Sequence, residues 1–179
     1  MRIISGNLKS IRFQPPKGFT SRPTTDFAKE ALFNVLEHRM SLINLEILDL
    51  CAGTGSISFE FASREAGTIT AVDSNFKSVQ YINSCAKKYK VDDLIIAVKS
   101  DALKFVSKTP YTFDLIFTDP PFDSNMHEEL VKVIKERKLL NEGGLLIVEH
   151  GKQTDLTHLT GYESTRKYGS VQFSFFKDL

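Results

Sequence analysis

Short apolar runs alternate along this chain with longer segments in which apolar residues recur at helical spacing. The runs predict β-strands at residues 46–50, 68–73, 94–98, 113–119 and 145–150. The segments between them predict helices at 56–65, 76–89 and 102–108, and from a cap at Ser124 through Lys138. Such alternation is typical of βαβ units, in which helices cover both faces of a mostly parallel sheet.

The two ends of the chain depart from this alternation. Residues 2–5 and 11–14 flank Gly6-Asn7 and predict a small β-hairpin. Thr24 or Thr25 can cap a helix from about 26 to 38, with an apolar face formed by Phe27, Ala31, Leu32, Val35 and Leu36. Residues 161–169 and 171–179 predict two strands joined by a tight turn near Gly169-Ser170. We therefore expect an α/β, Rossmann-like fold: a seven-stranded, mostly parallel sheet with an antiparallel C-terminal hairpin and a short N-terminal extension.

Length and composition fit one domain: the chain has 179 residues, of which 41% are hydrophobic and 25% are charged. We expect a basic N-terminal extension at residues 1–24 and a core at 25–179. No apolar run approaches the ~20 residues that span a bilayer, and the N-terminus lacks a signal-peptide pattern, so a cytoplasmic protein without a membrane contact is predicted. Cys51 and Cys85 lie far apart without metal-ligand spacing, so we expect reduced thiols and no metal site.

Basic residues are concentrated at the N-terminus, although the formal net charge is only +1. Residues 1–25 contain five cations and no acid: Arg2, Lys9, Arg12, Lys17 and Arg22. This distribution fits either a solvated arm or a surface that contacts nucleic acid.

The turn after the first strand of the main sheet carries a glycine motif, Asp49-Leu50-Cys51-Ala52-Gly53-Thr54-Gly55. Glycines there let a ligand approach the backbone, and Asp73, 20 residues after Gly53, stands where an acid holds a ribose in nucleoside-binding folds. The dinucleotide fingerprint needs a third glycine, but position 58 is Ser. An acid at position 49 also suits a pyrophosphate poorly, whereas a cationic, phosphate-free nucleoside such as S-adenosylmethionine would tolerate it.

Another acid follows the third strand. Asp101, which precedes Ala102, could reach an adenine amino group, although a helix N-cap is the commoner role of an isolated Asp in that place.

The fourth strand ends in Asp119-Pro120-Pro121-Phe122. The lone pair of an exocyclic amine on a nucleobase is delocalised into the ring, so methylation needs acceptors that hold both amine hydrogens. The Asp119 carboxylate and the Pro120 carbonyl can be those acceptors, because proline fixes the backbone and forces the preceding residue into an extended shape. Phe122 offers a face on which an unstacked base can lie. The alternative is a loop that simply stops the strand.

These motifs resemble a known family. "DLCAGTGS" is similar to the first motif of Rossmann-like S-adenosylmethionine methyltransferases, and "DPPF" to their motif for amino-group targets. The first 36 residues, with Arg22-Pro23-Thr24-Thr25 as their most specific part, resemble the RsmD family of bacterial methyltransferases for a guanine N2 in 16S ribosomal RNA, and the resemblance extends to "RKYG" near the C-terminus. Cys51 and Phe122 depart from the commonest form, which has Phe and Tyr there.

The resemblance implies a site and a partner: a monomeric enzyme whose substrate is 16S ribosomal RNA, either as naked RNA or within an assembling small subunit. The cofactor site would contain Asp49, Cys51, Ala52, Gly53, Gly55, Asp73, Ser74, Asp101 and Ala102. The catalytic residues would be Asp119, Pro120, Pro121 and Phe122, with Arg22 near the catalytic mouth and Lys9, Arg12 and Lys17 as further RNA contacts. Three alternatives stay open from the residues alone: an adenine-N6 or protein-glutamine methyltransferase with the same clamp, a dinucleotide oxidoreductase, and a non-enzymatic RNA-binding module.

Overall fold

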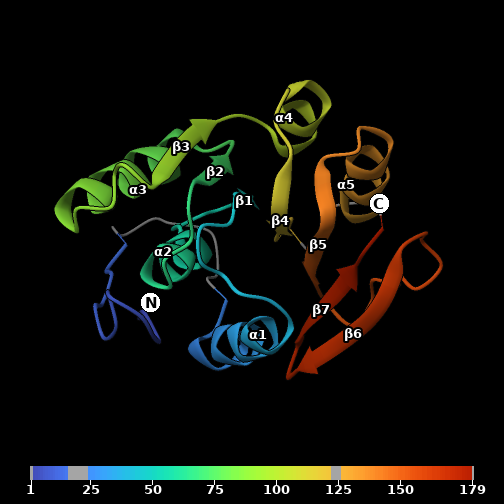
Figure 1. The fold of residues 1–179 in the computed structure, drawn as a ribbon, viewed down its shortest axis with the longest axis horizontal. Helices are drawn as coiled ribbons and strands as arrows, with labels where there is room; N and C mark the ends of the chain where they lie inside the picture. Colours follow the sequence, from blue (N-terminus) through green and yellow to red (C-terminus); the bar gives the residue numbers. More distant parts are fainter. Residues whose placement is uncertain (1, 16–23, 122–125, 179) are drawn as a thin grey trace.

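The computed structural model describes residues 2–15, 24–121 and 126–178, and it contains a seven-stranded sheet in the order β3-β2-β1-β4-β5-β7-β6 (Figure 1). The strands are β1 (Ile47–Leu50), β2 (Ile69–Asp73), β3 (Ile95–Lys99), β4 (Phe113–Thr118), β5 (Leu140–His150), β6 (Tyr162–Tyr168) and β7 (Val171–Phe176). The first five strands pair in parallel, whereas β7 pairs antiparallel with both β5 and β6. The predicted α/β fold, with a mostly parallel sheet and an antiparallel C-terminal hairpin, is confirmed.

Five helices cover the two faces of the sheet: α1 (Asp26–Arg39), α2 (Ser56–Ser63), α3 (Phe76–Lys88), α4 (Ala102–Lys108) and α5 (Met126–Glu136). The helices α1, α2 and α3 share one apolar cluster with one face of the sheet. The helices α4 and α5 share a second cluster with the other face (Figure 1). No helix in the described part of the chain is both long enough and apolar enough to cross a membrane.

Several predicted boundaries shift. The helices α2 and α3 end at Ser63 and Lys88, slightly before the predicted ends, while the proposed cap Ser124 lies outside the described residues. The strand β5 begins at Leu140 and not after the Gly143-Gly144 turn, because the register shifts between Phe113 and Leu115 of β4 and β5 takes up the extra residues. A Cβ atom on Gly144 would lie 2.8 Å from the Asn141 carbonyl oxygen, so this irregularity requires a residue without a side chain.

The predicted N-terminal hairpin is reduced to a single antiparallel bridge between Arg2 and Arg12. Its backbone donors turn instead toward α2: the Ile4 and Ser5 N–H groups donate to the Glu60 carboxylate at 2.9 and 3.1 Å. The approach is close at Gly6, where a Cβ atom would lie 1.8 Å from the Ser63 carbonyl oxygen.

A buried charge network completes this attachment. The Lys29 Nζ atom of α1 lies 3.3 Å from Glu60, and both side chains are fully buried. Lys29 also donates to the Arg2 carbonyl oxygen at 2.6 Å, and Arg64 Nη2 lies 2.9 Å from Glu60. Because a buried carboxylate needs such partners, Glu60 holds the N-terminal segment, α1 and α2 together.

Candidate active site

Four acidic residues project from the same face of the sheet at or near the carboxyl ends of its parallel strands. In β1, β2, β4 and β5 the apolar residues two positions earlier, Ile47, Ala71, Phe117 and Ile147, all belong to the cluster beneath α1, α2 and α3. Because side chains of a strand alternate between faces, Asp49, Asp73, Asp119 and Glu149 point to that same side. Ligands of open α/β sheets bind at this edge, next to the point where the strand order reverses, here between β1 and β4.

The glycine turn after β1 is connected directly to the acid that ends β2. The Gly53 N–H group donates to Asp73 Oδ2 at 2.7 Å, and the Asn75 N–H group donates to the other oxygen of Asp73 at 2.8 Å. Gly53 and Gly55 have positive φ angles of 55° and 74°, and Gly55 caps α2 without a side chain. The turn therefore places glycine backbone at a helix N-terminus next to a carboxylate, as a nucleoside site requires.

Asp49 is almost fully buried at the base of this turn, with 1% of its surface exposed. Its Oδ2 atom accepts from the Ser58 N–H group at 3.1 Å and from the Ser58 hydroxyl at 2.5 Å. Its Oδ1 atom has no hydrogen-bond partner among the described residues. Burial, opposed by the Ser58 hydrogen bonds, raises the pKa of Asp49 to about 7. A cationic group at Oδ1 would compensate for the charge that burial disfavours.

Asp119 and Glu149 lie side by side on neighbouring strands. Thr118 of β4 pairs with Val148 of β5, so the next residues, Asp119 and Glu149, share one rung and one face. Burial raises the pKa of Asp119 well above its usual value, and the negative charges of Glu149 and Asp49 raise it further. Burial also raises the pKa of Glu149 to about 7.

Glu149 also contacts the segment before α1. The Thr24 hydroxyl donates to Glu149 Oε2 at 2.8 Å, across 125 positions of sequence. Thr25 caps α1 by accepting from the Ala28 N–H group at 3.2 Å. The two adjacent threonines thus have different tasks: Thr25 starts the helix, and Thr24 joins it to the acidic site.

The remaining predicted cofactor residues line the same strand ends. Cys51 is half-buried in the glycine turn, where burial and the charge of Asp119 raise the pKa of its thiol to about 12. Asp101 accepts from the Lys104 N–H group at 2.9 Å and so caps α4, which is the commoner role considered for it. Ala52 and Ser74 stand in the loops that follow β1 and β2, and Ala102 is the first residue of α4 after β3. The cofactor role of each stays a prediction.

Of the predicted substrate residues, Pro120 is buried and Pro121 is exposed directly after β4. Phe122, Lys17 and Arg22 lie outside the described residues. Lys9 and Arg12 are exposed on the N-terminal segment.

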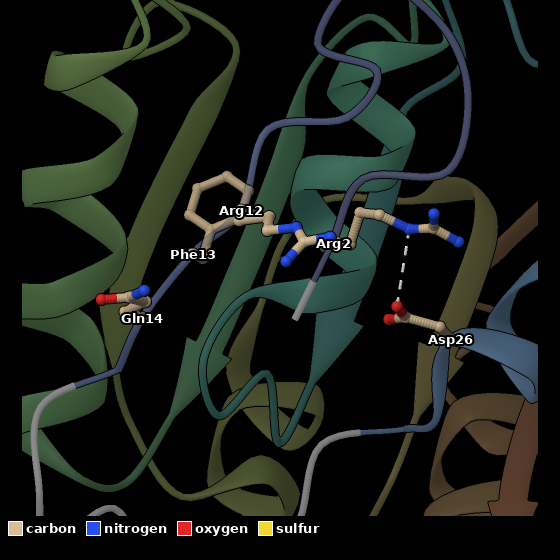
Figure 2. A pocket seen from close by; sticks show the side chains of 5 residues that line it. All are labelled: Arg2, Arg12, Phe13, Gln14 and Asp26. Carbon is tan, nitrogen blue, oxygen red and sulfur yellow. Dashed lines mark ion pairs between the residues drawn. The ribbon is translucent and has the colours of Figure 1, made fainter.

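A pocket of about 470 Å³ opens between that segment and the start of α1 (Figure 2). It is lined by Arg2, Arg12, Phe13, Gln14 and Asp26. The Arg2 guanidinium lies 3.6 Å from the Asp26 carboxylate, whereas Arg12 makes no ion pair within the described ranges. The pocket therefore presents an uncompensated cation.

Sequence reasoning missed the role of two residues at this site. The sequence alone assigned no role to Glu149, and Ser58 entered the prediction only as a departure from the dinucleotide fingerprint. His150 is buried and bonds to the Ser174 hydroxyl at 2.7 Å, so it serves the opposite face of the sheet. An acid that ends the fifth strand, as Asp73 and Asp119 end others, was the signal available for Glu149.

Comparison with known proteins places the chain in a family. The model of the family described as "Conserved hypothetical protein 95" matches residues 1–177. The Haemophilus influenzae protein named ribosomal RNA small subunit methyltransferase D is 32% identical over 161 residues, which cover 87% of this chain and 81% of the relative. The structure of the Thermus thermophilus hypothetical protein TTHA0928 superposes with a TM-score of 0.85 at 22% identity and covers 99% of both chains.

One further similar structure is a complex with ligands. The Thermus thermophilus 16S rRNA guanine-N2 methyltransferase RsmC, in complex with AdoMet and guanosine, superposes with a TM-score of 0.69 at 22% identity. The match covers 89% of this chain and 45% of that chain, and at this identity it shows the fold. The family match over nearly the whole chain shows that this protein belongs to the "Conserved hypothetical protein 95" family, and it confirms the resemblance to the RsmD methyltransferases that the motifs predicted.

Proposed function

We propose that this protein transfers a methyl group from S-adenosylmethionine to the exocyclic N2 amine of a guanine in small-subunit ribosomal RNA. One observation carries the proposal: Asp119, directly followed by two prolines, stands at the end of β4 beside Asp49 and the glycine turn of β1. A donor site and an amine acceptor thus share one edge of the sheet. The family, whose relatives include proteins named ribosomal RNA small subunit methyltransferase D, supports this assignment.

The donor site fits a nucleoside that carries positive charge. Asp73 would bind the ribose hydroxyls next to the Gly53 backbone. The orphaned Asp49 oxygen would accept from the α-ammonium group at the amino-acid end. A pyrophosphate would instead place negative charge beside Asp49, where burial already disfavours the carboxylate. When bound, the cofactor supplies a methyl group on a sulfonium centre.

The amine is activated by its acceptors. The Asp119 carboxylate and the Pro120 carbonyl would each hold one hydrogen of the guanine N2 group, which directs the nitrogen lone pair toward the methyl carbon. The nitrogen–carbon bond forms as the carbon–sulfur bond breaks, and that electron pair stays on sulfur. The methylated nitrogen then gives one proton to Asp119, whose raised pKa makes it a better base for this step.

The N-terminal segment would hold the RNA. Lys9 and Arg12 are exposed, and the Arg2–Arg12 pocket can accept a phosphate (Figure 2). The bonds of Glu60 to Ile4 and Ser5 hold this segment against the domain, so its charges keep a defined place relative to the site. Phosphate contacts of this kind fix the register of a nucleic acid.

The proposal is tested by methyl transfer to unmodified 16S ribosomal RNA, followed by mapping of the modified nucleotide. N2-methylguanosine is expected in the parent reaction. Asp119→Ala should lower turnover by a factor of at least ~10² and leave S-adenosylmethionine binding near the parent value, because the lost acceptor faces the base. Modification at adenine N6, or full activity of Asp119→Ala, would refute this assignment.

A further inference from the structure

An aromatic side chain that the core does not use stands at the edge of the candidate site. The helical pattern of α1 placed Phe27 on its apolar face, but the structure buries Ala28, Leu32, Phe33 and Leu36 and leaves Phe27 70% exposed. The buried face of α1 therefore lies beside the predicted one, and the Phe27 ring faces solvent. Among the described residues it is the most exposed of the large apolar side chains.

Phe27 lies at the same edge of the sheet as the acidic residues. Thr24, three positions earlier, contacts Glu149 near the carboxyl end of β5. Because β7 runs antiparallel to β5 and β6 antiparallel to β7, the turn between β6 and β7 also lies at this edge. Tyr168, the last residue of β6, meets Phe27 edge to face, with 6.2 Å between ring centroids.

Positive charge adjoins the two rings. Arg166 pairs with Phe173 of β7, which in turn pairs with Glu149 of β5, so Arg166 projects from the same face of the sheet as Glu149. Arg166 and Lys167 are exposed, and neither makes an ion pair within the described ranges. Lys167 pairs with Gln172, so it projects from the other face of this strand, at the same end of the sheet.

Other acids of β6 and of the first turn of α1 have cationic partners. Glu163 of β6 lies 3.4 Å from Lys177 and also pairs with Arg39, and Asp26 lies 3.6 Å from Arg2. Glu30 is exposed on α1 and makes no ion pair among the described residues.

We propose that Phe27, Tyr168 and Arg166 form a rim platform on which a base adjacent to the target guanine stacks, with Lys167 flanking it from the other face of β6. This inference rests on the proposed function and names how the substrate strand is held. A target base can enter the clamp only after it leaves its own stack, and its neighbours then lose a stacking partner. An exposed ring beside unpaired cations offers that neighbour a new face and its phosphates a counter-charge.

The alternative ligand for an exposed Phe side chain is the apolar surface of a protein partner. Two unpaired cations within three residues of Tyr168 favour a polyanion, and the edge carries the clamp that a nucleic acid must reach. A single exposed apolar side chain on a monomer surface is common and needs no ligand, so the proposal depends on the pair of rings together with the charges.

The test compares RNA binding and methyl transfer for variants at the rim. Phe27→Ala should weaken binding of the RNA about tenfold, since base–aromatic stacking contributes on that scale. Phe27→Leu should lose as much, because it keeps an apolar side chain but lacks a π-face, and Phe27→Trp should bind like the parent. The exposure of the site argues that each variant folds, and unchanged S-adenosylmethionine binding would show it.

A second experiment removes the stacked base from the RNA and keeps the Phe27 ring in the protein. An RNA that is abasic on either side of the mapped guanine should bind the parent about tenfold more weakly, and Phe27→Ala should show no further loss with that RNA. If the abasic RNA lost as much affinity for Phe27→Ala as for the parent, the proposal would be overturned. It would also be overturned if Phe27→Ala bound the intact RNA within twofold of the parent.

Charge at the rim is tested by salt dependence. The double variant Arg166→Gln with Lys167→Gln should reduce the slope of log affinity against log salt by about 1.4, which corresponds to two phosphate contacts on a single strand. Tyr111→Ala and Lys108→Gln are matched controls, because both residues are exposed and precede β4 at the opposite edge of the sheet. An unchanged slope in the double variant, or equal effects of the controls, would overturn the proposal. If the parent methylates no ribosomal RNA at all, the proposed function fails first, and the two failures are thus distinguishable.

Discussion

Replacing Asp49 with Asn should remove a pH-dependent loss of stability from the protein. The folded protein raises the pKa of this carboxyl from 3.8 to about 7, chiefly by burial. A tenfold change in proton affinity corresponds to about 1.4 kcal/mol, so ionising Asp49 in the folded protein costs about 4 kcal/mol relative to the unfolded chain. Since the folded state binds the proton more tightly, the free energy of unfolding falls as pH rises from about 4 to about 7.

The loss of stability is therefore expected within a pH range in which unfolding can be measured. Between pH 5 and pH 8 the free energy of unfolding of the parent should fall by about 3 kcal/mol more than that of Asp49→Asn. The amide oxygen can still accept both hydrogen bonds from Ser58, so the variant keeps the local structure, although its NH₂ group takes the position without a partner. The unpaired NH₂ group lowers the free energy of unfolding by the same amount at every pH, so it does not change how that free energy depends on pH.

Urea unfolding at a series of pH values measures this difference. Asp92→Asn is the matched control, because Asp92 is an exposed acid in the loop before β3, and its curve should run parallel to that of the parent. S-adenosylmethionine should stabilise the parent more at pH 8 than at pH 5 and should stabilise Asp49→Asn less at both. Parallel pH curves for the parent and Asp49→Asn would refute the conclusion that burial penalises this carboxylate.

Two further predictions concern the RNA surface and the clamp. Replacing both Lys9 and Arg12 with Gln should weaken RNA binding and flatten its salt dependence without changing cofactor affinity. Filter binding at several salt concentrations measures this. If the slope of log affinity against log salt stays like that of the parent, the segment is an ordinary solvated one. Glu149→Gln keeps an acceptor for the Thr24 hydroxyl but removes a charge that raises the pKa of Asp119, so Asp119 should ionise at lower pH. The acidic limb of the kcat/KM profile should then move to lower pH, and an unmoved limb would mean that Glu149 does not act on Asp119.

Most of the fold could be predicted from the sequence because the parallel strands are short apolar runs bounded by helical segments. The same reasoning located Asp49, Asp73 and Asp119, since a residue that ends a parallel strand must lie at the ligand-binding edge. It could not show that Asp119 and Glu149 share one rung, because the register of β4 against β5 depends on the irregularity around Gly143 and Gly144. Strand order and register are tertiary properties, which local patterns do not contain.

The N-terminal region shows the second limit. Residues 2–5 and 11–14 have the pattern of a hairpin, but the Ile4 and Ser5 N–H groups bond to a buried carboxylate of α2 and leave one bridge. Helical spacing likewise assigned Phe27 to the apolar face of α1, although the face that packs on the core carries Ala28, Leu32, Phe33 and Leu36. In both places the packing against distant elements decided the outcome, and no short window of sequence includes those partners.

Stability alone does not explain the row of carboxylates at the carboxyl ends of the parallel strands. Asp49, Asp119 and Glu149 are placed so that burial raises the pKa of each, and the charge of Asp49 acts on both of the others. A folded protein gains nothing by collecting such groups, and buried carboxylates without cations usually mark a site that binds something. A positively charged donor at Asp49, followed by an amine whose hydrogens point to Asp119, would relieve the repulsion in the order in which the reaction needs its components. Because Glu149 also accepts from Thr24, the last residue of the predicted basic extension, the charge state of this row and the position of Thr24 before α1 are physically connected.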